Sequence, residues 1–155
     1  MFFRINIDGI DIHLRVKGYS ASKKEIWDSQ WCNCDFAFRS GNWFNYHKED
    51  AEILLSCEVE ELEAELTKLL NGDLNDKKEI CCIEPDFVFT LHPERDLRKD
   101  TKYVYIKPGN EISDVYMEWK IYFWHEGLTD NFLTVTFDRN DIICLRDYLS
   151  SVITN

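Results

Sequence analysis

Two pairs of cysteines are the first residues whose type and spacing could do chemistry. Cys32 and Cys34 are separated by one residue, so on a strand both thiols would lie on one face, whereas the adjacent Cys81 and Cys82 would point to opposite faces. A zinc site needs two further ligands at a compatible spacing, and the sequence contains no C-x-x-C or H-x-x-x-H pair. We therefore predict reduced cysteines that pack as small hydrophobic side chains, with no metal ion and no cofactor.

Two histidines stand beside carboxylates, which is the combination that general acid or base catalysis uses. His47 lies two residues before Glu49, and His125 directly precedes Glu126. Both pairs fall in polar segments typical of turns, and neither adjoins a nucleophile in a G-x-S-x-G elbow. The pattern favours exposed loop residues, and we predict no catalytic residues.

The segment after the first predicted helix partly matches a calcium-binding loop. Asp73 and Asn75 have the spacing of the first two ligands, and Glu84 stands at the twelfth position. Lys77 occupies the third ligand position, however, and Lys78 replaces the glycine that the loop requires. A polar turn therefore explains the segment better than a calcium site.

Alternating apolar and polar residues predict the strands that must position these side chains. The predicted strands cover Phe3–Ile7, Ile10–Val16, Trp31–Arg39, Trp43–Tyr46, a short extended piece at Ile53–Leu55, Glu79–Ile83, Asp86–Leu91, Tyr103–Ile106, Val115–Trp124 and Asn131–Phe137. A polar stretch from Ser20 to Ser29 separates the first two hairpins, and His47 to Glu52 is a second polar stretch. Pro85 suggests an edge position or a bend between its flanking strands.

Two amphipathic helices with the same apolar spacing complete the predicted fold. The first is predicted from an N-cap at Ser56 to a stop at Asn71-Gly72, and the second starts at Asp138 with Asp141 as its capping partner. Their apolar faces are Val59, Leu62, Leu66 and Leu69 in the first, and Ile142, Leu145, Leu149 and Val152 in the second. Glu60, Glu61, Glu65 and Lys68 are predicted to face solvent. The shared spacing suggests either an internal duplication or convergence.

These elements predict one α+β domain over residues 1–155. We expect a largely antiparallel β-sheet of about eight to nine strands, packed with the two helices. A chain of 155 residues is long enough for one hydrophobic core and does not require a second.

The charge of the chain limits its partners. Twenty-nine acidic and eighteen basic residues give a formal net charge of -11, which repels nucleic acid phosphates and suits a basic protein partner. The same charge would also keep a protein soluble without any partner. The sequence shows neither a signal peptide nor an apolar run long enough for a membrane helix, so we expect a cytoplasmic protein that does not bind membranes. The oligomeric state is left open.

Several segments, in their order along the chain, resemble the WapI-like family of small immunity proteins from bacterial polymorphic toxin systems. The resemblance runs from about Gln30 onward and rests on Trp31-Cys32-Asn33-Cys34-Asp35-Phe36, the acidic helix within Glu52–Leu70, Ile83-Glu84-Pro85-Asp86-Phe87, Gly127-Leu128-Thr129-Asp130-Asn131 and the closing helix. It implies a non-enzymatic cytosolic inhibitor that binds and occludes a cognate toxin domain.

An acidic inhibitor would suit a basic, nuclease-type toxin, since complementary potentials accelerate association. We therefore predict that the partner contacts Glu49, Asp50, Glu52, Glu60, Glu61 and Glu65. Two other classes of function stay open at this point. A small-ligand or regulatory module would hold an apolar cavity, and an enzyme would bring together distant groups such as His13, Glu118 and His125.

Overall fold

The first half of the chain forms a four-stranded antiparallel sheet followed directly by a helix. The computed structural model describes residues 1–21 and 30–155. Sheet A has the strand order β1-β2-β3-β4 and is followed by α1; the elements are β1 (Phe3–Ile7), β2 (Ile10–Lys17), β3 (Trp31–Ser40), β4 (Phe44–Leu55) and α1 (Ser56–Asn71). Asp8 and Gly9 both have positive φ and form the tight turn of the first hairpin, as the Asp-Gly pair predicts.

The second half repeats this plan with one interruption. Sheet B has the order β10-β9-β6-β5 and is followed by α2; its elements are β5 (Lys78–Cys81), β6 (Phe87–His92), β9 (Tyr116–Trp124), β10 (Leu128–Phe137) and α2 (Arg139–Thr154). Residues 93–114, here called the arm, leave the sheet between β6 and β9. The arm contains β7 (Arg95–Asp96), a short 3-10 helix (Leu97–Lys99) and β8 (Ile112–Ser113).

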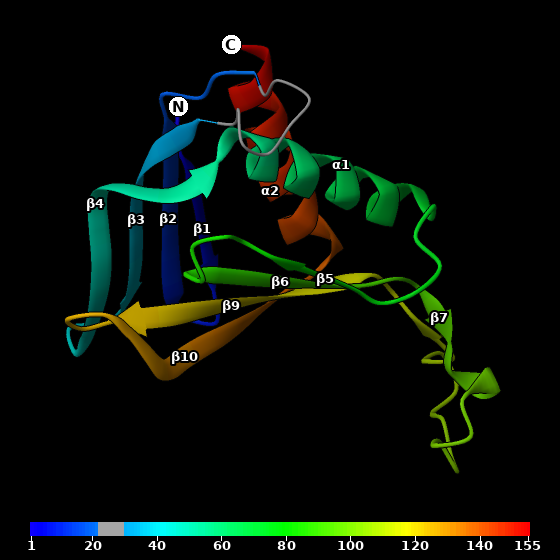
Figure 1. Cartoon of the computed structure of the whole chain (residues 1–155). Helices are drawn as coiled ribbons and strands as arrows, with labels where there is room; N and C mark the ends of the chain where they lie inside the picture. Colours follow the sequence, from blue (N-terminus) through cyan, green and yellow to red (C-terminus); the bar gives the residue numbers. More distant parts are fainter. Residues whose placement is uncertain (22–29) are drawn as a thin grey trace.

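The two sheets and the helix pair enclose one core. Figure 1 shows the strands of sheet B running across those of sheet A, with α1 and α2 side by side above both sheets and the arm projecting away from the body. Each sheet is a sequential meander that leads into a helix of 16 residues. The predicted resemblance between the two halves therefore extends from helix spacing to topology.

Aromatic rings fill the space between the sheets. Phe36 of sheet A lies 5.0 Å from Phe87 and 5.8 Å from Trp119 of sheet B, measured between ring centroids. All three side chains are almost completely buried. Each such pair adds roughly 0.5–1.5 kcal/mol beyond the burial of its area, so this cluster fixes how the sheets pack.

Both helices pack through the apolar faces that the sequence predicts. Val59, Leu62, Leu66 and Leu69 of α1 and Ile142, Leu145 and Leu149 of α2 are buried, while Val152 packs on the core as a partly buried residue. Gly72 ends α1 in the left-handed conformation, with its N–H donating to the carbonyl of Leu69. The predicted helical stop is confirmed.

The helix starts are confirmed in one case and corrected in the other. Asp138 caps α2, because its carboxylate accepts from the N–H groups of Asn140 and Asp141. Ser56 is the first residue of α1 rather than its cap. The Glu58 carboxylate accepts instead from the N–H of Leu55, which is the residue that precedes the helix.

Several strand predictions also need correction. One long strand, β4, replaces the predicted short strand, polar stretch and extended piece between Trp43 and Leu55. Tyr103–Ile106 is not a strand, and the strands of the arm are β7 and β8. The α+β class is confirmed, but the described strands number ten and form two four-stranded sheets and a two-stranded one instead of a single large sheet. Most of the polar stretch Ser20–Ser29 lies outside the described residues.

Neither described helix is long and apolar enough to cross a membrane.

Candidate partner-binding surface

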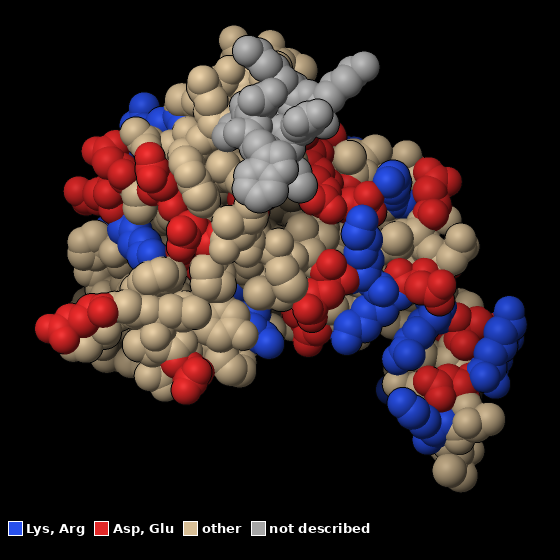
Figure 2. Space-filling model, viewed as in Figure 1, with Lys and Arg blue, Asp and Glu red and all other residues tan. Residues whose placement is uncertain are grey.

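Three of the six predicted contact residues lie together on one edge strand. Glu49, Asp50 and Glu52 belong to β4, which pairs with β3 alone within the described part of the chain and is therefore an edge of sheet A there. All three side chains are exposed. Figure 2 shows acidic side chains gathered over β4 at the upper left of the molecule. We call these three residues the β4 acidic cluster.

A β-bulge shapes this cluster. Phe36 pairs with Lys48 and Cys34 pairs with Ala51, so Glu49 and Asp50 together stand opposite the single residue Asp35. Asp50 has a φ of 48°, in the left-handed region that aspartate tolerates better than most residues. The bulge interrupts regular pairing and projects the two carboxylates from the edge.

Lys17 of β2 holds the bulge from across the intervening strand β3. Its ammonium group donates to Asp35 at 2.6 Å and also contacts the carboxylate of Asp50, while the N–H of Asp50 donates to Asp35 at 3.0 Å. The hydrogen bond from Lys17 is the main reason that the pKa of the Asp35 carboxyl is lowered. One cation is thus shared between two carboxylates, and the site keeps a net negative charge.

Glu49 and Glu52 remain available to a partner. Among the described residues, neither side chain has an ion-pair or hydrogen-bond partner. Beside them, the outer face of sheet A has a hollow of about 420 Å³ lined by charged and histidine side chains, among them His13, Arg15, Arg39, His47, Glu49 and Asp50. Burial, together with Arg4 and Arg39, lowers the pKa of His13. Apolar residues such as Phe2 and Ala37 complete the lining, so the hollow is of mixed character and is not the apolar cavity that a small-ligand module would hold.

The three contact residues predicted on α1 have different surroundings. Glu61 is exposed, but Glu60 accepts a hydrogen bond of 2.7 Å from the hydroxyl of Tyr19. Glu65 is only 6% exposed and is held by Lys68 at 2.7 Å and Lys78 at 3.1 Å. The prediction that Glu65 faces solvent is wrong, because two lysines allow its carboxylate to be buried at the base of the helix.

The lysine contacts also change the acidity of that carboxylate. The hydrogen bond from Lys68 lowers the pKa of Glu65, and Lys78 acts in the same direction. The carboxylate is therefore ionised and internally paired, so it contributes little to attracting a partner. Glu61 is the exposed member of the three, and it too lies 3.8 Å from the ammonium group of Lys78.

Three cysteines are buried as the sequence predicts, but Cys81 and Cys144 are exposed, so the prediction that all pack as small hydrophobic side chains is wrong for these two. Cys32, Cys34 and Cys82 are buried, and all six cysteines have free thiols. Burial raises the pKa of Cys34 to about 12, so its reactive thiolate is scarce at neutral pH. Within residues 1–21 and 30–155, no group of histidine, cysteine and acidic side chains could hold a metal ion, and this includes the segment with the partial calcium pattern.

His13, Glu118 and His125, the distant groups considered for catalysis, are not brought together, although His13 shares the hollow on sheet A with His47 and Glu49. His13 lies on the outer face of sheet A, whereas Glu118 of β9 pairs with His92 at 2.9 Å. His125 follows the far end of β9, roughly 20 Å from Glu118 along the strand. These positions do not form an acid–base constellation.

Two features of the described surface were not predicted. Lys48 and Asp86 form an ion pair that links β4 to the turn between β5 and β6. The arm carries exposed hydrophobic side chains at its end, within a mixture of basic and acidic residues visible at the lower right of Figure 2. The abundance of lysine and arginine between residues 95 and 107 is the signal that could have identified the arm.

Comparison with known proteins gives the family. No curated protein matches the sequence. The family model described as the immunity protein WapI-like family matches residues 1–155, which is the whole chain and includes the first hairpin that the resemblance noted above left out. The protein thus belongs to the WapI-like immunity protein family.

Proposed function

We propose that this protein is a cytoplasmic, non-enzymatic immunity protein that binds a cognate basic toxin domain and covers its active surface. Membership of an immunity protein family is the observation that carries the proposal. The β4 acidic cluster supports the location of the contact, since its carboxylates project from an edge strand and two of them have no partner among the described side chains.

The negative charge of this surface should speed association with a basic toxin. A toxin that acts on nucleic acid carries basic groups around its active site, because its substrate is polyanionic. An acidic inhibitor is attracted to those groups, and the attraction raises the association rate by roughly 10- to 1000-fold at low salt. Fast association matters for an immunity protein, because the toxin must be neutralised before it finds its target.

The direct test uses the cognate toxin, which we expect to be encoded beside the gene for this protein. Co-expression with the toxin domain should restore growth, and the two proteins should co-purify. If growth is not restored and no complex forms, the proposed function fails. If the chain consumes a substrate of the toxin instead of binding the toxin, the non-enzymatic part of the proposal fails.

A second test locates the contact. The variant Glu49→Lys/Glu52→Lys reverses the two unpaired charges of the cluster. The matched control Glu126→Lys/Asp130→Lys makes the same charge change in the turn before β10 and at the start of that strand. We expect association with the toxin, measured by stopped flow at low salt, to slow by about tenfold or more in the first variant and much less in the control. The difference should shrink at high salt, since exposed charges are screened. Equal rates in both variants would place the interface elsewhere.

A further inference from the structure

The arm carries apolar side chains that are exposed to solvent. It leaves sheet B between β6 and β9 and extends away from the body (Figure 1). At its end, the side chain of Val104 is fully exposed, Tyr105 is 77% exposed and Tyr103 is 43% exposed. Tyrosine is among the residues that contribute most to protein interfaces, and such a cluster is unfavourable in water unless a partner covers it.

The arm is ordered by its own hydrogen bonds. The N–H of Leu97 donates to the carbonyl of Glu111 at 2.8 Å, which ties the two sides of the arm together next to the β7–β8 pair. The Nε and Nη2 groups of Arg98 both donate to Asp96 at 2.8 Å, and Arg95 donates to the hydroxyl of Tyr103. An ordered loop loses less conformational entropy on binding than a disordered one.

These internal contacts leave basic charge exposed. Asp96 is paired with Arg98, Asp100 lies 3.5 Å from Arg95, and Glu111 accepts from the N–H of Gly109. The exposed lysines of the arm form no ion pair with any described residue; they are Lys99, Lys102 and Lys107. The end of the arm is therefore an apolar tip with a basic collar on a protein whose net charge is -11.

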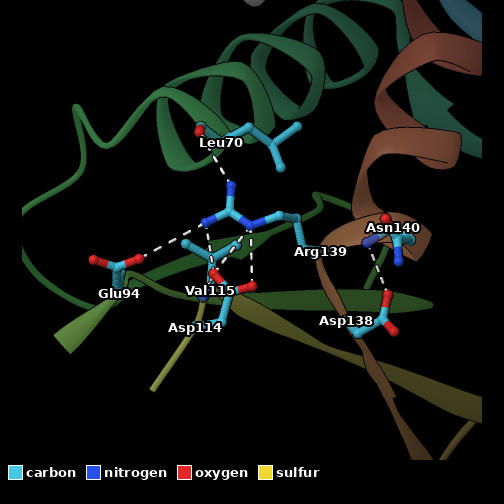
Figure 3. A network of polar contacts seen from close by, with 7 residues as sticks. All are labelled: Leu70, Glu94, Asp114, Val115, Asp138, Arg139 and Asn140. Atoms are coloured by element: carbon cyan, nitrogen blue, oxygen red, sulfur yellow. Dashed lines mark hydrogen bonds and ion pairs between the residues drawn. The ribbon is translucent and has the colours of Figure 1, made fainter. Parts of the chain in front are cut away.

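Arg139 holds the root of the arm in place. Its guanidinium donates to Asp114 through Nε at 3.0 Å and through Nη2, and it lies 4.0 Å from Glu94. It also donates to the carbonyl of Leu70 at the end of α1 (Figure 3). Glu94 and Asp114 stand at opposite ends of the arm, so one residue of α2 connects both ends to the helix pair and fixes the direction of the arm.

We propose that the arm is a second docking element, whose tip Tyr103-Val104-Tyr105 inserts into a concave, acid-lined pocket of the toxin. The inference rests on the proposed function. Shape supports it, because a projecting apolar tip buries most area in a concave site. Charge supports it as well, because the collar of Lys99, Lys102 and Lys107 matches acidic groups at the rim of such a pocket.

The test compares the dissociation of two variants from the cognate toxin domain identified by the co-expression test above. Tyr103→Ser/Val104→Ser/Tyr105→Ser removes the tip, and Ile83→Ser/Leu128→Ser removes exposed apolar side chains elsewhere as a control. We expect the tip variant to dissociate about tenfold faster or more, with little change in association rate, and the control to behave as the wild type. Unchanged thermal unfolding of the tip variant will show that its fold is intact.

The possible results separate the two proposals. If the wild type binds the toxin and the tip variant dissociates at the same rate, the docking role of the arm is wrong while the proposed function stands. If the wild type does not bind the toxin, both fail. If the tip variant changes only the self-association of the free chain, measured by light scattering, the arm contacts a second copy and this inference is overturned. Reversal of the collar by Lys99→Glu/Lys102→Glu should weaken the toxin complex in a salt-dependent way, and a salt-independent result would contradict the charge argument.

Discussion

Replacing Asp86 should destabilise the protein, because it removes an ion pair that connects the two sheets. Asp86 lies in the turn between β5 and β6, and its carboxylate pairs with the ammonium group of Lys48 on β4 of sheet A. The ammonium group also lies 4.5 Å from the centroid of the Trp124 ring. The side chain of Asp86 is 4% exposed and that of Lys48 is 22% exposed, so the pair is largely removed from water.

The burial of the pair sets the size of the effect. Loss of one partner from a fully buried ion pair destabilises by about 3–5 kcal/mol, because the remaining charge stays in a poorly solvated site. Lys48 keeps some contact with water, which reduces the effect, so we expect Asp86→Ala to lower the free energy of unfolding by about 2–3 kcal/mol. Replacing both charges, in Lys48→Met/Asp86→Leu, removes the unpaired charge and should restore most of that loss.

A double-mutant cycle measures this coupling. Urea unfolding at pH 7 of the wild type, Lys48→Met, Asp86→Leu and the double variant gives the interaction free energy, and Asp86→Ala is measured alongside them. The reasoning predicts that the double variant is more stable than the sum of the two single losses implies. Additive losses, or an effect of Asp86→Ala below about 1 kcal/mol, would show that the pair behaves as an exposed surface contact.

Three further predictions concern the helix starts and the root of the arm. Burial raises the pKa of Glu58, so this carboxyl should contribute more to stability as the pH falls from 7 toward the ordinary carboxyl pKa of 4.5. Between pH 7 and pH 5, the free energy of unfolding should therefore change less favourably in Glu58→Gln than in the wild type, and equal changes in denaturation experiments would contradict this. Arg139→Lys should lower global stability by less than about 1 kcal/mol, because its partner Asp114 is exposed. The same variant should speed hydrogen exchange in the arm, because lysine cannot make the two-pronged contact of the guanidinium with Asp114; unchanged exchange would show that Arg139 does not hold the arm. Asp138→Ala should lower stability by about 1 kcal/mol through loss of the α2 cap, seen as a lower Tm, and no change would show that the cap is dispensable.

Local sequence patterns were enough to predict the helices and most strands. The apolar spacing of α1 and α2 and the Asp138 cap depend on residues three or four positions apart, so the sequence shows them directly. The first hairpin was equally clear, because Asp8-Gly9 stands between two alternating segments. These features need no knowledge of the rest of the fold.

The charged contacts could not be predicted in the same way. Tyr19 meets Glu60 across 41 residues of sequence, and Lys48 meets Asp86 across 38. Such pairs form only when the sheets and helices pack together, so the local spacing of residues does not predict them. The burial of Glu65 failed as a prediction for the same reason, because its partner Lys78 belongs to β5.

The polar residues proposed to bind the toxin are also the reason that β4 was not predicted as one strand. Its polar residues suggested a loop between Trp43 and Leu55, since a half-buried strand normally alternates. An edge strand with a bulge breaks that alternation, and Asp50 in the left-handed conformation shifts the register by one residue. The residues that contradicted the strand pattern are those proposed to contact the toxin.

The net charge of -11 therefore describes the binding properties of this protein poorly. On α1, the carboxylate of Glu60 accepts a hydrogen bond from a tyrosine, and that of Glu65 is paired with two lysines. On β4, two carboxylates have no partner among the described side chains. The unpaired charge of the arm is basic, and the arm and β4 lie on opposite sides of the molecule in Figure 1. A uniformly basic partner would be attracted to β4 and repelled by the arm. If both surfaces bind one toxin, that toxin must combine a basic face with an acidic pocket, and only a partner with both would discriminate this protein from another acidic one.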